Sequence, residues 1–364
     1  MIPKLVLSFL LLFTNGLRAQ KPDTSQLSLL FVGDIMGHNT QIVSAYCDAS
    51  KNYDYSECFK YIKPEISKAD IAFANLEVTL AGKPYKGYPQ FSSPDELAVA
   101  IKDAGFDVLV DANNHACDRR KNGIVRTIKV LDSLSILHTG TYVNDSERNT
   151  LCPLLITKNN IRLAILNYTY GTNGISVPKP TIVNLLDSLV IQKDLEKAQA
   201  LKPDKIIVIT HWGTEYENLP NARQKRWCKF LQANGADIII GSHPHVIQPM
   251  VWDSIDDNFV VYSLGNFISN QRATPKDGGL ILKLNLEKIG NKTRLANVNY
   301  LFSWVYRPKI GSKYHFMIIP AAEYEDMPPF FQADTAAYPK MLQFLDYERK
   351  LLKDCGIKEQ IGRK

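Results

Sequence analysis

Short apolar runs alternate with longer amphipathic stretches through the middle of the chain. The runs are rich in Val, Ile and Leu, and polar residues bound each of them. Continuous apolar runs of this length are typical of strands buried on both faces of a sheet. We therefore predict strands in LSLLFVGD (27–34), ADIAFANLE (69–77), FDVLVDANNH (106–115), IRLAILNYT (161–169), DKIIVITHWG (204–213), ADIIIGSHPH (236–245) and NFVVYSLGNF (258–267).

Helical spacing of apolar residues fills the gaps between these runs, at 93–105, 121–134, 185–201 and 222–234. The first of these segments offers Ser93 as N-cap, Glu96 to close a capping box and Gly105 as a stop. Alternating strands and helices predict a layered α/β fold. After about residue 290 the pattern changes to antiparallel strand material at 293–308 and a terminal helix at 336–355.

Polar motifs end six of the apolar runs. Ligands of open α/β sheets bind at the carboxyl ends of the strands, so these motifs are expected to meet at one edge. The motifs are Gly33-Asp34, Asn75-Leu76-Glu77, Asn113-Asn114-His115, His211-Trp212-Gly213, His243-Pro244-His245 and Leu264-Gly265-Asn266.

Four of the seven histidines lie in these motifs. A single histidine is more often a partly buried packing residue than a ligand, but four of them beside Asp34, Glu77 and Asn114 predict a metal site. Imidazole, carboxylate and amide groups without a thiolate suit Zn²⁺, Mn²⁺ or Fe and do not choose between them. A mixed nitrogen and oxygen site of this kind favours a catalytic role over a structural one.

Composition and charge limit the class of protein. The chain has 364 residues, of which 45% are hydrophobic and 22% charged, as expected for one large globular domain with a real core. Its formal net charge of +6 comes from scattered residues, which argues against a nucleic-acid surface. No CxxC pair occurs among the six cysteines, and Cys47 with Cys58 is the best candidate for a disulfide.

The N-terminal residues predict export. Lys4 precedes an apolar stretch from Leu5 to Phe13, and Leu17-Arg18-Ala19 forms a cleavage site before Gln20. The alternative is an uncleaved membrane anchor, although the stretch is short for a membrane span. We expect residues 1–19 to be a signal peptide and the mature protein to be periplasmic or associated with the cell envelope.

The motif series resembles the poly-γ-glutamate capsule biosynthesis (CapA-type) family, a branch of the calcineurin-like metallophosphatase superfamily. The resemblance extends from about residue 27 to 285 and rests on motifs in the same order. These motifs are FVGDIMGHN, NLEVTL, DANNHACD, HWGTEY, GSHPHVIQP and YSLGNF.

The resemblance implies a four-layer α/β/β/α sandwich over residues 20–290, with the strands and helix of residues 291–364 packing on it. It also implies a divalent metal site with one or two ions, and a role for His115 in protonating a leaving group or stabilising negative charge. Asn75, Glu215 and Asn266 are expected to orient the substrate or the ligands. The implied metal ligands are Asp34, Glu77, Asn114, His211, His243 and His245.

Two departures from the superfamily pattern leave occupancy by two metals open. Asp34 is followed by Ile35 and Met36 where the superfamily has Asp-x-His, and Glu77 stands where an aspartate is usual. His38 lies two residues further on and is interpreted as a surface or loop residue.

Two functions from different classes follow from these expectations. The first is an exported metal-dependent hydrolase that acts on a phosphoester, γ-glutamyl or other cell-envelope substrate. The alternative is a non-catalytic factor that binds an anionic polymer and assists its assembly or export. Both functions allow contact with membrane-bound capsule synthesis machinery, and neither involves nucleic acid.

Overall fold

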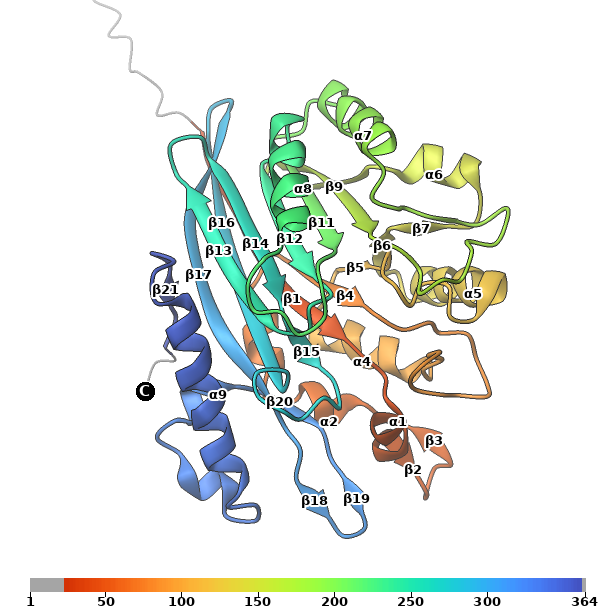
Figure 1. Cartoon of the computed structure of the whole chain (residues 1–364), viewed down its shortest axis with the longest axis vertical. Coiled ribbons are helices and arrows are strands. Elements are labelled where there is room, and N and C mark those ends of the chain that lie inside the picture. Colours follow the sequence, from red (N-terminus) through yellow and green to blue (C-terminus); the bar gives the residue numbers. More distant parts are fainter. Residues whose placement is uncertain (1–22, 362–364) are drawn as a thin grey trace, which may run out of the picture.

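A nine-stranded sheet is the larger of the two main sheets in the computed structural model, which describes residues 23–361 (Figure 1). Four parallel strands, β1, β4, β5 and β6, form one half, and antiparallel strands extend the sheet on the other side of β1. Short β15 pairs with β1, and β21 pairs with β17. The strands are β1 (Thr24–Ile35), β4 (Ile71–Leu76), β5 (Val108–Val110), β6 (Leu137–Thr139), β15 (Asn266–Ile268), β16 (Gly278–Ile289), β17 (Lys292–Tyr306), β20 (Met317–Pro320) and β21 (Lys358–Glu359).

A second sheet has six strands in the order β13-β14-β12-β11-β9-β8. Its four central strands are parallel, and the two edge strands are antiparallel to their neighbours. The strands are β8 (Leu154–Lys158), β9 (Ile161–Thr169), β11 (Lys205–His211), β12 (Ile238–Ser242), β13 (Ile247–Asp253) and β14 (Asn258–Leu264). Three two-stranded ribbons complete the described strands: β2 (Tyr46–Cys47) with β3 (Asn52–Tyr53), β7 (Thr141–Tyr142) with β10 (Ile182–Val183), and β18 (Lys309–Ile310) with β19 (Lys313–Tyr314).

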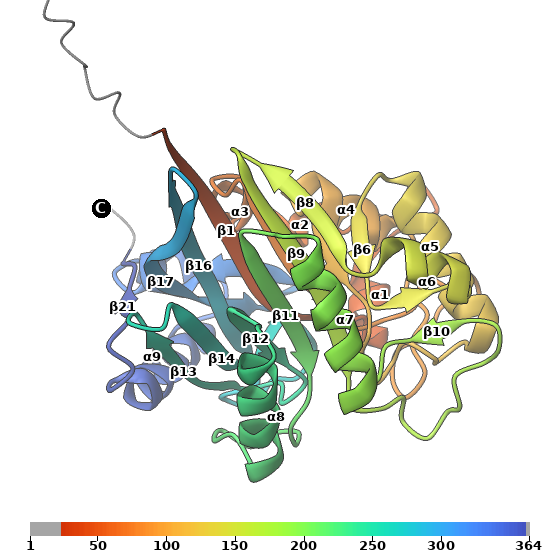
Figure 2. The same cartoon turned by 90° about the horizontal axis from the view of Figure 1, so that it is seen from above.

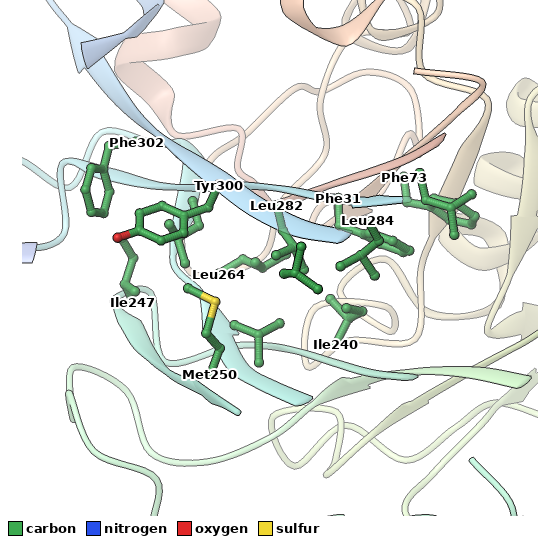
Figure 3. Close-up of a cluster of buried hydrophobic side chains, with 14 of the residues drawn as sticks. Phe31, Phe73, Ile240, Ile247, Met250, Leu264, Leu282, Leu284, Tyr300 and Phe302 are labelled. Carbon is green, nitrogen blue, oxygen red and sulfur yellow. The ribbon is translucent and has the colours of Figure 1, made fainter. Parts of the chain in front are cut away.

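The two sheets pack face to face across an apolar core. Figure 3 shows Phe31 and Leu282 of the larger sheet on the opposite side of this core from Ile240 and Met250 of the smaller one. Burial of this area supplies most of the driving force for stacking the sheets.

Helices cover the outer face of each sheet, which completes four layers (Figure 2). Helices α2 to α5 pack on the larger sheet, and α7 and α8 pack on the smaller one. Helix α9 contacts β13 and β17 and closes one side of the core between the sheets. The helices are α1 (Asn39–Ala45), α2 (Ser56–Phe59), α3 (Lys63–Ile66), α4 (Glu96–Ala104), α5 (Arg120–Ser133), α6 (Asp145–Leu151), α7 (Ser188–Ala200), α8 (Ala222–Ala233), α9 (Ala337–Leu352), and the 3₁₀ turns η1 (Ala321–Tyr324) and η2 (Pro328–Phe331).

The four-layer α/β/β/α sandwich expected from the sequence is therefore the observed architecture. Strand β17, which follows residue 290, pairs along its length with β16 and belongs to the larger sheet. The expected signal peptide lies outside the described residues. Within residues 23–361, no helix has the length and apolar character needed to cross a membrane.

Two local predictions are wrong. Helix α4 begins at Glu96 after Asp95, not after Ser93, because the Ser93 amide donates to Thr79 and keeps the preceding segment extended. All six cysteines are free, so Cys47 and Cys58 do not form the predicted disulfide. Cys47 is exposed in a surface ribbon, whereas Cys58 belongs to α2 and is buried in the core between the helices and the larger sheet.

Candidate metal centre

Acidic and imidazole side chains from both sheets meet at the carboxyl ends of the parallel strands. Asp34 ends β1, Glu77 follows β4, and His211 ends β11. His243 and His245 follow β12. All five side chains are buried, and residues that are far apart in the sequence become neighbours because each lies at the end of a strand.

Glu77 is shared by two possible ligand groups. One group contains Glu77, His211 and His243, and the other contains Asp34, Glu77 and His245. Within each group the ligand atoms lie within 4.8 Å of one another. Glu77 Oε1 is 3.5 Å from His211 Nε2 and 3.7 Å from His245 Nε2. A carboxylate in this position can bridge two ions, an arrangement known from two-metal hydrolytic sites.

Amide side chains hold the two carboxylates in place. Asn75 Nδ2 donates to Asp34 Oδ1 at 2.7 Å and lies 3.5 Å from Glu77 Oε2. Asn266 Nδ2 donates to the backbone oxygen of His245 at 3.3 Å, and its Cα pairs with that of Asp34. The structure thus brings both of these predicted orienting residues into contact with the proposed ligands.

Asn114 and His115 lie at the same edge, after β5. Asn114 Oδ1 is 2.9 Å from His211 Nε2, so these two potential ligand atoms point to a common position. His115 Nδ1 lies 2.8 Å from Asp118 Oδ2, and that oxygen also accepts the backbone amide of Phe91. Asp118 therefore fixes the orientation of the His115 ring.

Backbone conformation aims the two histidines of the β12 turn. His243 has a φ of 97° and His245 a φ of 57°, backbone angles that residues other than glycine rarely adopt. Strain of this kind persists where the surrounding structure holds it, and it clusters at functional sites. Pro244 stands between them and has a restricted φ of its own, so the turn is well defined.

Burial controls the protonation of the cluster. It raises the pKa of Glu77 well above its usual range, and the charge of Asp34 adds to this effect. Burial also raises the pKa of Asp34, but the hydrogen bond and charge of His245 outweigh it and leave that pKa lowered. Burial lowers the pKa of His211 to about 3 and that of His243 well below its usual range. Neutral imidazoles are the form that binds metals.

The residues present fit a divalent cation. Glu77 Oε1 and His243 Nδ1 are buried and lack a hydrogen-bond partner among the described residues. Buried polar atoms are nearly always satisfied, so such atoms call for a ligand. Asp34, a buried carboxylate whose pKa is lowered, also supplies a negative charge beside His211 and His243 that a cation would neutralise.

Glu215, Tyr216 and His38 lie at the rim of the site. Glu215 is exposed in the loop after β11, and its charge raises the pKa of both Glu77 and Tyr216. Tyr216 places its ring 6.2 Å from that of His245. His38 is half-buried in the loop between β1 and α1, in agreement with its interpretation as a surface or loop residue, and its side chain contacts Gln41 and accepts the backbone amide of Asn270.

Other residues of the site were not predicted. Ser242 Oγ lies 2.9 Å from His211 Nδ1, and the ring of Tyr170 lies 4.5 Å from that of His243. Asp118 orients His115, as described above. Tyr170 directly follows β9, so the rule that found the other strand-end residues could also have found this one.

The buried histidines make the stability of the metal-free protein depend on pH. Burial lowers the pKa of His38 from 6.5 to about 4, and that of His211 to about 3. Below pH 6.5 the unfolded chain therefore binds more protons than the folded one, so the free energy of unfolding decreases as the pH is lowered. We expect a loss of about 1.4 kcal/mol per pH unit for each group in this window.

Urea unfolding of metal-stripped protein at a series of pH values measures this dependence. His38→Gln should reduce the slope of unfolding free energy against pH, and His315→Gln, at a residue paired with Glu57 on the surface, serves as the matched control. A slope that is equal in wild type and His38→Gln would contradict the expectation.

The fold and the cluster together define a class: a two-sheet α/β sandwich with a candidate metal centre at its strand ends. Residues 28–271 match the family model described as bacterial capsule synthesis protein PGA_cap. The chain belongs to this bacterial capsule synthesis protein family, as the sequence motifs predict.

Two curated relatives support the assignment. The capsule biosynthesis protein CapA of Bacillus anthracis is 32% identical over 273 residues, which cover 71% of this chain and 64% of the relative. The PGA biosynthesis protein CapA of Bacillus subtilis (strain 168) is 30% identical over 274 residues, which cover 72% of this chain and 69% of the relative. The match thus spans just under two thirds of the Bacillus anthracis protein.

Solved structures resemble this fold only distantly. A novel phosphatase from Mycoplasma pneumoniae has 15% identity and a TM-score of 0.45, covering 77% of this chain and 94% of that chain. The NAD nucleotidase NadN of Haemophilus influenzae has 11% identity and a TM-score of 0.44, and the match covers 93% of this chain and 58% of that chain.

Proposed function

We propose that this protein is an exported, metal-dependent hydrolase of capsule synthesis that acts on a phosphoester or γ-glutamyl linkage of an anionic cell-envelope polymer. We place it in the cell envelope, beside membrane-bound capsule synthesis machinery. The observation that carries the proposal is the buried position of Glu77 between two histidine-containing ligand groups. A purely structural site would not need a buried carboxylate shared between two groups of ligands at a sheet edge.

Each residue of the cluster has a role in this proposal. Asp34, Glu77, Asn114, His211, His243 and His245 would hold one or two divalent ions such as Zn²⁺, Mn²⁺ or Fe. An ion bound there lowers the pKa of a water molecule or polarises a substrate oxygen. Asn75 and Asn266 keep Asp34 and His245 in position by the hydrogen bonds described above.

His115 is the proposed general acid or stabiliser of negative charge. It is buried at the same edge and directly follows Asn114, whose Oδ1 lies 2.9 Å from His211 Nε2. Asp118 holds Nδ1 of the ring, which leaves Nε2 as the nitrogen that can serve the substrate. Glu215, exposed at the rim, is proposed to orient the substrate.

Replacement of His115 tests the hydrolytic role. We expect His115→Gln to lower kcat by about a hundredfold or more, because a positioned general acid contributes that much. Metal content should stay unchanged, since His115 is not a proposed ligand. Turnover of phosphodiester and γ-glutamyl substrates, with metal content measured in the same preparations, checks both statements.

His315→Gln is the matched control, at an exposed pair with Glu57 on the surface. Equal turnover in wild type and His115→Gln would contradict the role of His115. Tight binding of an anionic polymer without turnover of any substrate would favour the alternative function, a non-catalytic assembly or export factor.

A further inference from the structure

A cavity outside the metal centre has four cations and one acid among its lining residues. It has a volume of about 350 Å³ and lies between the loop after β15, the end of β17, the β18–β19 ribbon and the start of α9. Its charged lining residues are Arg272, Arg307, Lys309, Lys340 and a single acid, Asp334.

Arg272 is the unusual member of this set. Its guanidinium makes no hydrogen bond and no ion pair with any residue between 23 and 361, and its Nη1 is buried. The guanidinium carbon lies 5.7 Å from the ring centre of Trp304. Asp277 and Asp334 are close enough to affect Arg272 electrostatically, but neither forms an ion pair with it, and Asp277 accepts the indole hydrogen of Trp304. A partly buried guanidinium with a buried Nη1 that has no hydrogen-bond partner keeps a donor free for an anion from outside the chain.

The other three cations are also free of ion pairs within the described part of the chain. Arg307 donates to Asn270 Oδ1 at 2.7 Å and stacks on Tyr314. Lys309 and Lys340 are exposed at the rim. Positive charge therefore continues from a partly buried guanidinium to the surface, which suits a ligand with several negative groups better than one isolated anion.

One loop joins this cavity to the metal centre. Asn266, which orients His245, donates to the side chain of Gln271 and to the backbone of Lys276. The next residue after Gln271 is Arg272, which lines the cavity. Lys276 places its ammonium 4.3 Å from the ring centre of Tyr216, at the rim of the centre. The loop thus contacts the metal centre on one side and the cationic cavity on the other.

We propose that the cavity formed around Arg272, Arg307, Lys309 and Lys340 binds carboxylates of an anionic polymer whose neighbouring segment lies at the metal centre. The carboxylates would pair with the Arg272 guanidinium in the cavity and with the lysines at its rim. That this polymer is the substrate rests on the proposed function, whereas anion binding in the cavity does not.

Binding of a γ-linked glutamate oligomer to the mature protein tests the proposal, after metal has been stripped and the chelator removed. Isothermal titration calorimetry should detect binding that weakens as salt is raised. Arg272→Gln is expected to weaken it about tenfold or more, and Lys340→Gln by a smaller factor. Lys129→Gln, which removes an exposed cation on α5, should leave it unchanged.

Stability measurements separate a binding role from a structural one. Arg272→Gln should unfold at the same or a higher urea concentration than wild type, since it removes a partly buried charge that makes no ion pair with any described residue. Unchanged binding in both Arg272→Gln and Lys340→Gln would overturn the proposal. Binding of inorganic phosphate without binding of the oligomer would overturn the assignment to a polymer. Because the test uses metal-free protein, failure of the hydrolase proposal would leave a positive result standing.

Discussion

Glu77→Gln is expected to lower affinity for divalent metal more than a hundredfold and to abolish turnover. Glu77 belongs to both ligand groups, so the substitution removes a ligand from each of them. Replacing a residue that only supports a metal ligand lowers metal affinity about 10- to 100-fold. Replacing a ligand that both groups share should lower it further. Titration of metal into stripped protein, with kcat measured in parallel, gives both quantities.

The fold of the Glu77→Gln protein should survive. Burial raises the pKa of Glu77 well above its usual range, so the metal-free protein already favours the neutral form that glutamine imitates. Metal added at about a thousandfold excess over the wild-type Kd should stabilise wild type by about 4 kcal/mol and the variant by less than about 1.4 kcal/mol. Glu217→Gln is the matched control, because Glu217 is an exposed glutamate in the loop after β11. Equal metal stabilisation in Glu77→Gln and wild type would contradict the shared-ligand role.

Gly33→Ala is expected to destabilise the protein by about 3 kcal/mol and to weaken metal binding at the same time. A Cβ atom at Gly33 would lie 1.9 Å from the backbone oxygen of Gly265, so β1 and the turn before β15 would have to separate. Asp34 is the next residue, and its amide donates to that same oxygen. Urea unfolding and metal titration measure the two effects.

Gly171→Ala is the control for this substitution, because a Cβ atom there meets nothing within 4 Å. Its free energy of unfolding should stay within about 0.5 kcal/mol of wild type. If Gly33→Ala bound metal as tightly as wild type, the close approach of the two backbones would not be what positions Asp34.

The positions of the site residues could be predicted because they depend on strand direction. A polar motif after a buried parallel strand lies at the carboxyl edge of the sheet whatever the details of packing. Strand direction alone predicts that Asp34, His211 and His243 lie together. It could not show that Glu77 lies between two groups, because that depends on how the two sheets stack.

Features set by tertiary contacts were harder to predict. Strand β16 alternates Leu280, Leu282, Leu284 and Leu286 with other residues, a period-two pattern, yet it was not among the predicted strands. Ser93 satisfies the capping rule, but its amide donates to the backbone oxygen of Thr79 in the loop after β4. The cationic cavity draws Arg272, Arg307 and Lys340 from three separate segments, and no motif marks their proximity.

Anomalous X-ray diffraction from crystals of the protein loaded with Mn²⁺ or Zn²⁺ tests the central claim most directly. The account predicts a peak coordinated by Glu77, with His211 and His243 or with Asp34 and His245 completing the ligands, and peaks at both positions if two ions bind. An absence of anomalous density at Glu77 under saturating metal, in crystals whose side chains at this edge are ordered, would contradict it.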